Sequence, residues 1–486
     1  MNIMAEVIPH WLTKQADLSP ESIAIELDDG STVTFKTLKE KSQSFARKLA
    51  KIGVTEGSHV GVLSTNQIPM VVAIHALSYL GAIGVLLNTR LADEELNYQL
   101  KDAEVSILLT ADDLKETVQA LDVNNIQSFT DIDTQPEKQF TLKTELSLDD
   151  IFTIMYTSGT TGFPKGAIHT YGNHWWSAIG SALNLGLNPD DKWLISLPIF
   201  HVSGLSTFIK SAIYGMPIYL LEKFEARTVH QAIMDKGITI VSVVTVMVQR
   251  LIEQLKGEKY PNSLRCLLLG GGPAPRPMLE SAKEKSIPVF QSYGMTETAS
   301  QIVTLSPKDA LRKVGSAGKP LFPAQLKIAR SADEPVGEIL VKGPMVTKGY
   351  FKKDDANENT FDDGWLATGD MGYLDDEGFL YVVDRRKDLI ISGGENIYPS
   401  EIESVLSGME QIKEVGVAGR LDDVWGKVPV AFVVKNQEVS EEEIHNYAAN
   451  LLAKYKLPKE IHFVEVLPRN ASNKLVRNKL IHLIIK

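Results

Sequence analysis

The chain is poor in cysteine and in positive charge, and each scarcity excludes a class of protein. It has one cysteine, Cys266, among 486 residues, so no internal disulfide can form and a reducing compartment suits it. Because Cys266 lies in the apolar run LRCLLL, we expect a buried hydrophobic residue rather than a nucleophile. The 50 basic and 61 acidic residues give a net charge of −11, which excludes the broad basic field that attracts nucleic acid or anionic lipid.

Targeting and membrane-spanning segments are also missing from the sequence pattern. The N-terminus has no basic start followed by an apolar core, so we expect no signal peptide and a cytoplasmic protein. The uncharged apolar run 68–88 approaches the length of a membrane span, but Pro69, His75 and Gly81 interrupt it. We therefore expect a buried helix up to Leu80, followed by a short buried strand, and no membrane span.

Helical patterns alternate with short Val/Ile/Leu runs through roughly the first 300 residues, which predicts an α/β fold with helices over largely parallel sheets. The polar stretch 131–150 is expected to be a surface excursion. From about residue 313, short strand-like pieces between turn residues predict an antiparallel β-rich subdomain. We predict a large N-terminal domain, 1–384, with this subdomain at about 313–384, and a small α+β domain, 388–486. The strand-like runs are 60–63, 106–110, 192–197, 218–221, 239–244 and 265–269, and the amphipathic segments are 35–52 and 227–236.

The segment YTSGTTGFPKG, 156–166, carries the clearest chemical signal, because it follows a strand-like apolar piece and is rich in hydrogen-bond donors. Glycine lets backbone N–H groups approach a phosphate closely, hydroxyl groups donate hydrogen bonds, and a lysine supplies a point charge. The spacing is not that of the common P-loop. We predict a phosphate-binding loop that includes Thr157, Ser158, Gly159, Thr160, Thr161, Gly162 and Lys165.

This loop resembles the phosphate signature of the adenylate-forming superfamily, and further motifs follow in that superfamily's order. They are SYGMTET (292–298), LATGD (366–370), DRRKD (384–388), SGGENIYPSEIE (392–403) and PRNASNK (468–474). The resemblance covers about residues 20 to 480. It implies an N-terminal domain of mixed sheets covered by helices plus a β-rich subdomain, with a mobile C-terminal domain that turns about a hinge at Lys387.

The resemblance also implies roles for individual residues. Glu297 would hold Mg²⁺, which prefers one or two carboxylates together with phosphate oxygens. Lys474 would bridge the attacking carboxylate and the α-phosphate, where two anions meet. Lys165 would act with it in catalysis. Besides the loop, the nucleotide would contact Gly270, Gly271, Gly272, Tyr293, Gly294, Thr296, Asp370 and Arg385.

Two other groups of residues are assigned by the same resemblance. The ten histidines show no metal-ligand spacing, so we expect no metal at His201, in LPIFHVSG. By the resemblance, His201 would gate the acyl pocket and belong to the catalytic set; the alternative is a buried structural histidine. Ser203, Gly204 and Gly271 would also line that pocket. Gly393 and Gly394 would face coenzyme A.

Within the superfamily, the wider similarity is to the 2-succinylbenzoate–CoA ligase family of menaquinone biosynthesis. It rests on the segments at 169–187, 197–206, 289–307 and 467–480. It implies ligation of the acid to coenzyme A through an acyl-AMP, with ATP and Mg²⁺ and without a nucleic-acid partner, and it allows a homo-oligomer. The alternatives are a CoA ligase for another aryl or fatty acid, an adenylation domain serving a carrier protein, and a non-catalytic nucleotide-binding regulator. The residues alone indicate a pocket for a small or aromatic acid and do not show what holds a second carboxylate.

Overall fold

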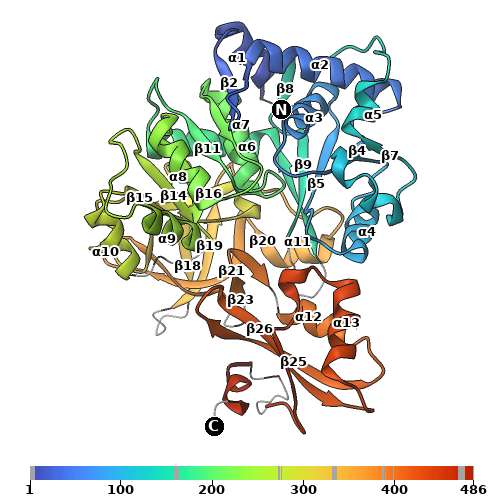
Figure 1. Cartoon of the computed structure of the whole chain (residues 1–486), viewed down its shortest axis with the longest axis vertical. Coiled ribbons are helices and arrows are strands. Elements are labelled where there is room, and N and C mark those ends of the chain that lie inside the picture. Colours follow the sequence, from blue (N-terminus) through green and yellow to red (C-terminus); the bar gives the residue numbers. More distant parts are fainter. Residues whose placement is uncertain are drawn as a thin grey trace.

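The computed structural model has a large N-terminal body and a small C-terminal lobe, which lie at opposite ends of the long axis (Figure 1). It describes residues 6–157, 164–271, 274, 276–330, 336–385, 388, 390–397, 399–468, 475 and 477–484. We call the described residues up to 385 the body and those from 388 onward the lobe. The domain boundaries predicted above remain our proposal.

The largest sheet of the body has 14 strands and changes from parallel to antiparallel along its width. Its parallel half runs in the order β2 (Ile23–Leu27), β12 (Ile218–Leu220), β11 (Trp193–Ile195), β13 (Ile240–Val244), β14 (Cys266–Gly270) and β15 (Val289–Met295). Its antiparallel half continues through β16 (Ser300–Leu305), β17 (Ser316–Pro320), β22 (Leu380–Arg385), β21 (Trp365–Leu374), β19 (Gly337–Lys342) and β18 (Gln325–Ala329). The predicted β-rich region therefore continues the main sheet.

A six-stranded sheet forms the rest of the body's framework. Its order is β10 (Lys165–Thr170), β9 (Ile151–Thr157), β5 (Ile83–Leu87), β4 (His59–Leu63), β6 (Ile107–Thr110) and β7 (Ile126–Ser128), and only the β9–β10 pair is antiparallel. Helix α3 (Ile68–Leu80) connects β4 to β5 and ends at Gly81, whose φ of 69° is left-handed. This confirms the helix and strand predicted for the uncharged run 68–88.

Other sequence predictions for the body are largely confirmed. The amphipathic segments form α2 (Phe35–Lys51) and α8 (Ala226–Asp235). Cys266 is fully buried, and burial raises the pKa of its thiol, so it is no nucleophile. The surface excursion was wrong in part: the stretch 131–150 holds the end of α5 (Phe129–Asp133) and strand β8 (Glu145–Ser147), which pairs with β1 (Val7–Pro9). Ile132 and Leu146 are buried there, because burying an apolar side chain is favourable even when its neighbours in the sequence are polar.

The lobe is an α+β unit with a core of its own, as predicted. A five-stranded sheet contains β23 (Ile390–Ser392), β24 (Glu395–Ile397), β25 (Ile412–Asp422), β26 (Gly426–Lys435) and β27 (Glu460–Phe463). Helices α12 (Pro399–Leu406) and α13 (Glu441–Leu451) supply Ile402 and Ile444 to a core shared with Val417 and Val433 of the sheet.

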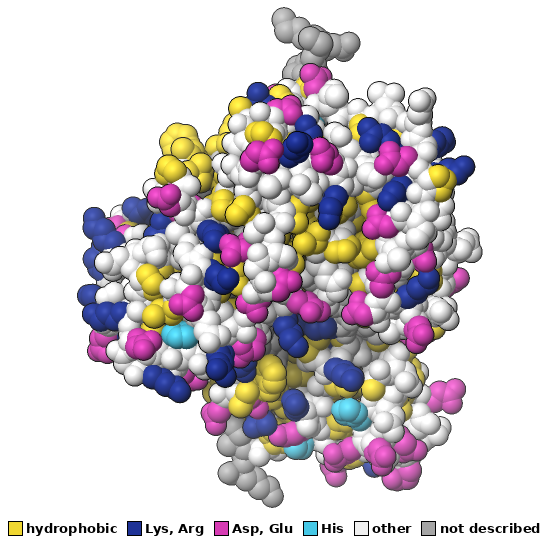
Figure 2. All heavy atoms as spheres, turned by 45° about the horizontal axis from the view of Figure 1, so that its top comes forward, with side chains coloured by type: hydrophobic (Ala, Val, Ile, Leu, Met, Phe, Trp, Pro, Cys, Tyr) yellow, Lys and Arg dark blue, Asp and Glu magenta, His cyan; other side chains and the backbone are white. Residues whose placement is uncertain are grey.

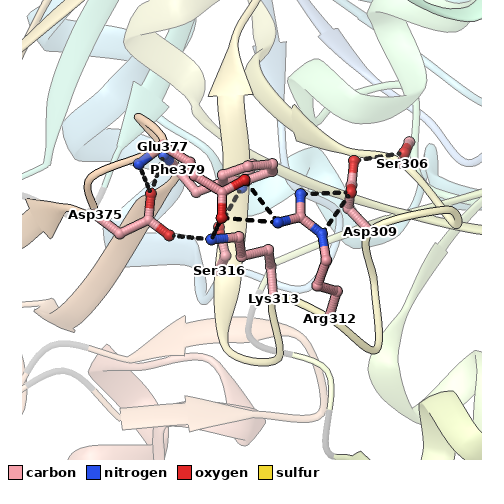
Figure 3. A network of polar contacts seen from close by, with 9 residues as sticks. Ser306, Asp309, Arg312, Lys313, Ser316, Asp375, Glu377 and Phe379 are labelled. Carbon is pink, nitrogen blue, oxygen red and sulfur yellow. Dashed lines mark hydrogen bonds and ion pairs between the residues drawn. The ribbon is translucent and has the colours of Figure 1, made fainter.

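A polar network ties the β16–β17 loop to the β21–β22 hairpin (Figure 3). Lys313 Nζ lies 2.6 Å from Asp375 Oδ2 and 2.7 Å from Glu377 Oε1. Arg312 donates two hydrogen bonds to the same Glu377, at 2.8 and 2.6 Å. Solvent screens ion pairs of this kind, so each contributes little by itself, but together they hold the loop on the hairpin.

The surface of the body carries charges of both signs. On the face shown in Figure 2, basic and acidic side chains are interspersed. Within the described ranges, no helix is both long and apolar enough to cross a bilayer.

Candidate active site

A cavity of about 1490 Å³ lies between the body and the lobe and is lined by residues from both. It collects most of the residues predicted from the sequence, although they come from strands and loops far apart in the chain. These are Thr157, Lys165, His201, Ser203, Gly270, Gly271, Tyr293, Gly294, Thr296, Glu297, Gly393 and Gly394.

The predicted phosphate loop joins the two antiparallel strands β9 and β10 at the cavity wall. Thr157 and Lys165 are direct cross-strand partners, so both ends of the loop lie side by side. The Nζ atom of Lys165 lies 5.1 Å from the centre of the Tyr350 ring. The loop residues Ser158, Gly159, Thr160, Thr161 and Gly162 are outside the described residues.

The predicted ribose residue is held by a tyrosine of the second nucleotide motif. The hydroxyl of Tyr293, on β15, donates a 2.7 Å hydrogen bond to Oδ2 of Asp370, on β21, and both residues are buried. The neighbours Thr368 and Gly369 line the cavity. At Gly294 a side chain would overlap the Ser300 backbone, so the bulge in β15 requires glycine there.

Gly270 and Gly271 end β14 at the cavity, and Gly271 has a left-handed φ of 80°. Any side chain at these positions would reduce the space for a flat ligand beside Ser292 and Val244. Gly272 is outside the described residues.

The predicted metal residue, Glu297, is buried at the start of the short helix η3 (Thr296–Thr298). Its Oε1 accepts a 2.8 Å hydrogen bond from the Tyr350 hydroxyl, which fixes the carboxylate beside the cavity. The described residues contain no group of three or more acidic, histidine or cysteine side chains that could hold a metal ion by themselves. A single positioned carboxylate fits Mg²⁺ that takes its remaining oxygens from phosphates and water.

Helix α7 (Val202–Tyr214) forms one wall of the cavity beyond the nucleotide residues. His201 directly precedes its first residue, and one helix face lines the cavity with Ser203, Ser206, Thr207 and Lys210. Gly204 does not join them: a side chain there would overlap the Pro198 backbone, so the structure places this glycine at a packing contact instead of the acyl pocket.

The lobe closes the cavity opposite the body. Gly393 and Gly394 both have left-handed φ angles, of 57° and 90°, in the turn between β23 and β24. A Cβ on Gly394 would lie 3.2 Å from Cγ2 of Val244, so glycine permits the close approach of the two parts.

Next to this turn, Glu395 of the lobe contacts two residues of the body. It accepts a hydrogen bond from Arg90, and its Oε2 lies 3.8 Å from His201 Nε2. Burial alone would raise the pKa of Glu395, but His201 and Arg90 outweigh it, and the pKa lies below its ordinary value.

A buried ion triad joins the body and the lobe more deeply. Lys456 Nζ lies 2.5 Å from Glu95 Oε1 of the body and 2.6 Å from Glu401 Oε1 of the lobe. Burial lowers the pKa of Lys456, but the two carboxylates outweigh it and raise the pKa above its ordinary value. Glu95 also accepts a 2.7 Å hydrogen bond from the Ala453 backbone N–H. These contacts fix one orientation of the lobe.

Three further predicted residues are described only in part or not at all. Only the backbone of Arg385 is described, and it pairs with Asp370 across β21 and β22. Lys387 and Lys474 lie outside the described residues. Leu475, the next described residue after position 468, packs against Gly416 of β25, and none of the described residues 464–484 lines the cavity.

The sequence reasoning missed Arg90, Lys456 and Lys210 as cavity residues. Lys210 is the single charged residue of an otherwise uncharged helix. That isolation was a usable signal, because a lysine on an apolar helix face is rare without a function.

Comparison with known proteins agrees with this geometry. Residues 12–351 match the model of the AMP-binding enzyme family, and residues 401–474 match the AMP-binding enzyme C-terminal domain. This chain belongs to the AMP-binding enzymes. The fold class predicted from the sequence is thereby confirmed.

Within the AMP-binding enzymes, this chain is similar to 2-succinylbenzoate–CoA ligases. It is 62% identical over 482 residues to a 2-succinylbenzoate–CoA ligase of Oceanobacillus iheyensis. The aligned region covers 98% of this chain and 100% of the relative. A double mutant of o-succinylbenzoate CoA synthetase from Bacillus subtilis, bound with its product analogue OSB-NCoA, is 48% identical, with 98% of each chain covered and a TM-score of 0.95. The same enzyme with the acyl-adenylate intermediate OSB-AMP has the same identity and coverage but a TM-score of 0.77.

Proposed function

We propose that this AMP-binding enzyme is a 2-succinylbenzoate–CoA ligase that forms the thioester through an acyl-AMP and acts in menaquinone biosynthesis. The observation that carries the proposal is the single cavity in which the nucleotide residues, the α7 wall and the glycine turn of the lobe meet. Full-length identity of 62% to such a ligase supports it. We also propose a cytoplasmic location, from the single buried cysteine.

In the first half-reaction, a carboxylate oxygen of the acid attacks the α-phosphorus of ATP, and the bond to pyrophosphate breaks. A carboxylate is a poor acyl donor because its leaving group would be oxide, whereas AMP leaves readily. We assign Lys165 and Thr157 to the phosphates, Asp370 to the ribose hydroxyls, and Tyr293 to holding Asp370 in place.

Magnesium fits at Glu297, since a Bacillus subtilis relative has been solved with ATP and a magnesium ion and the carboxylate here is held by Tyr350. When bound, the ion neutralises negative charge on the phosphates. The residues of this chain orient the Glu297 carboxylate through Tyr350 and shield it from bulk water.

In the second half-reaction, the sulfur of coenzyme A attacks the acyl carbon, the bond to AMP breaks, and the thiol proton is lost. The lobe orientation described here is the one suited to this step. This orientation places Gly393 and Gly394 at the cavity. The whole chain also superposes with a higher TM-score on the relative bound to a product analogue than on the relative bound to the acyl-adenylate. Leu475 lies away from the cavity, and we assign adenylation, with Lys474 as its catalytic lysine, to a second orientation of the lobe.

Glu95→Gln is expected to slow thioester formation from preformed acyl-AMP by about 10- to 100-fold while leaving adenylation within a factor of three. The substitution removes the charged hydrogen bond between the body and Lys456 but leaves the Lys456–Glu401 pair inside the lobe. A hydrogen bond to a charged group contributes about 1.5–3 kcal/mol, and here that energy belongs to one lobe orientation. Single-turnover measurement of each half-reaction checks this.

Glu94→Gln is the matched control, since Glu94 is the exposed neighbour of Glu95 on helix α4 (Asp93–Asp102). It should leave both half-reactions unchanged. Equal slowing of both half-reactions by Glu95→Gln would contradict the role of the triad in selecting an orientation.

The proposed function is tested by supplying ATP, Mg²⁺, free coenzyme A and a panel of acids. We expect 2-succinylbenzoyl-CoA to form with a kcat/KM at least 10²-fold above those for benzoate, fatty acids and other aryl acids. A better fatty or aryl acid would favour the alternative CoA ligase. Adenylate formation without transfer to free coenzyme A would favour the carrier-protein alternative, and absence of turnover would favour a nucleotide-binding regulator.

A further inference from the structure

The inner end of the cavity holds a lysine without an acidic partner. Lys210, on α7, is 2% exposed and lines the cavity. It has no hydrogen bond or ion pair to any other described residue, and its Nζ lies 5.5 Å from the centre of the Trp193 ring. Burial is the one cause that lowers the pKa of Lys210, to about 7, so no nearby carboxylate offsets it.

The other cationic side chains that line the cavity have different surroundings. Arg90 pairs with Glu395, and Lys456 pairs with Glu95 and Glu401. Lys165 lies at the phosphate hairpin, and Lys223 and Lys427 are exposed. Among the described residues, Lys210 is therefore the buried cation of this cavity that is left for an anionic ligand.

The position of Lys210 on its helix suits the far end of an acyl group. Ser203, Ser206 and Lys210 share one face of α7, and the helical rise places Lys210 about 10 Å beyond Ser203. His201 at the helix start is partly exposed, whereas Lys210 is buried. The wall thus runs from an open mouth beside the lobe to a closed, cationic inner end.

Neutral donors at the cavity wall are also unsatisfied. Ser196 Oγ and Gln291 Nε2 are buried, line the cavity and have no hydrogen-bond partner among the described residues. Buried polar groups are normally hydrogen-bonded, so donors that stay unpaired on the wall of the cavity that Lys210 also lines indicate a place for a ligand with several acceptor oxygens. A carboxylate has that chemistry.

We infer that Lys210 is a specificity residue that binds the second carboxylate of the substrate, the one that does not become an adenylate. The inference rests on the proposed function, because 2-succinylbenzoate carries two carboxylates and ligation consumes one. The remaining carboxylate is still ionised when it enters a buried pocket, and burying it unpaired would be costly. A buried ammonium group and a buried carboxylate compensate each other.

The test compares two acids in wild type and in Lys210→Met, which keeps the length of the side chain and removes the charge. The reference acids are 4-oxo-4-phenylbutanoate, without the ring carboxylate, and 2-propanoylbenzoate, without the chain carboxylate. Whichever of the two gives the faster acid-dependent pyrophosphate release is the reference. We expect wild type to prefer 2-succinylbenzoate by about 10²-fold or more in kcat/KM, as expected for a buried charge pair, and the variant to lose most of this preference.

The preference ratio is insensitive to a general loss of active enzyme, because both acids are measured on the same preparation. Lys210→Gln, which keeps a donor without the charge, is used if thermal melting shows Lys210→Met to be unfolded, and should lose the preference likewise. A variant that keeps the wild-type preference, or a wild type without one, would overturn the inference. Wild-type enzyme that does not turn over 2-succinylbenzoate at all would refute the proposed function instead.

Discussion

Replacing Lys474 by alanine is expected to slow acyl-adenylate formation by about 10²–10³-fold and to leave the reaction of preformed acyl-AMP with coenzyme A within about threefold of wild type. An electrostatic contact made to the transition state contributes roughly 3–4 kcal/mol. Lys474 is selected by the motif PRNASNK and ends the segment matched by the C-terminal domain model. The two half-reactions are measured separately, by pyrophosphate release and by thioester formation.

The prediction assigns Lys474 to adenylation and not to thioester formation, so the two half-reactions should respond differently to its loss. The described residue Leu475 packs against the lobe sheet, away from the cavity, in the orientation suited to thioester formation. Lys479→Ala is the control, because Lys479 is an exposed lysine of the same terminal segment. Equal losses in both half-reactions, or an equal effect of Lys479→Ala, would contradict the assignment.

Glu297→Gln is expected to lower the adenylation rate by on the order of 10²-fold and to raise the Mg²⁺ concentration needed for half-maximal rate. The variant keeps the size of the side chain and an oxygen that can accept from Tyr350, but it loses the charge that attracts the ion. The rate is measured as a function of Mg²⁺ concentration at saturating ATP.

Tyr350→Phe distinguishes the effect of the position of the Glu297 carboxylate from the effect of its charge. It removes the 2.8 Å hydrogen bond and keeps the carboxyl group of Glu297, so we expect a smaller loss, about three- to tenfold, at high Mg²⁺. If Glu297→Gln left the Mg²⁺ dependence unchanged, the residue would have a structural role only.

Local motifs predicted many of the residues that the fold brings together at one cavity. Thr157 and Lys165 are predicted to flank one loop, and a hairpin does bring them together. Tyr293 and Asp370 are 77 positions apart, and each was found by its own motif. Their direct hydrogen bond was not predictable, because it depends on how β21 joins the main sheet through β22, β17 and β16.

The residues that sequence reasoning missed depend on the packing of distant elements. Glu95 and Lys456 are 361 positions apart, and each looks like a solvated charge until the lobe meets the body. Lys210 lies in no recognised motif. Its place in the site follows only from the fold, which packs it near Trp193 and on the cavity wall. Similarly, the stretch 131–150 looks like a loop by composition, and pairing with the N-terminal strand overrides that composition.

Exchange of labelled pyrophosphate into ATP, in the absence of coenzyme A, examines the activation step by itself. Incorporation of the label should require 2-succinylbenzoate and Mg²⁺ together, since reversal of adenylation is the one route by which pyrophosphate re-enters ATP. Thioester synthesis without any such exchange, or label entering ATP when the acid is left out, would contradict an acyl-AMP intermediate in this cavity.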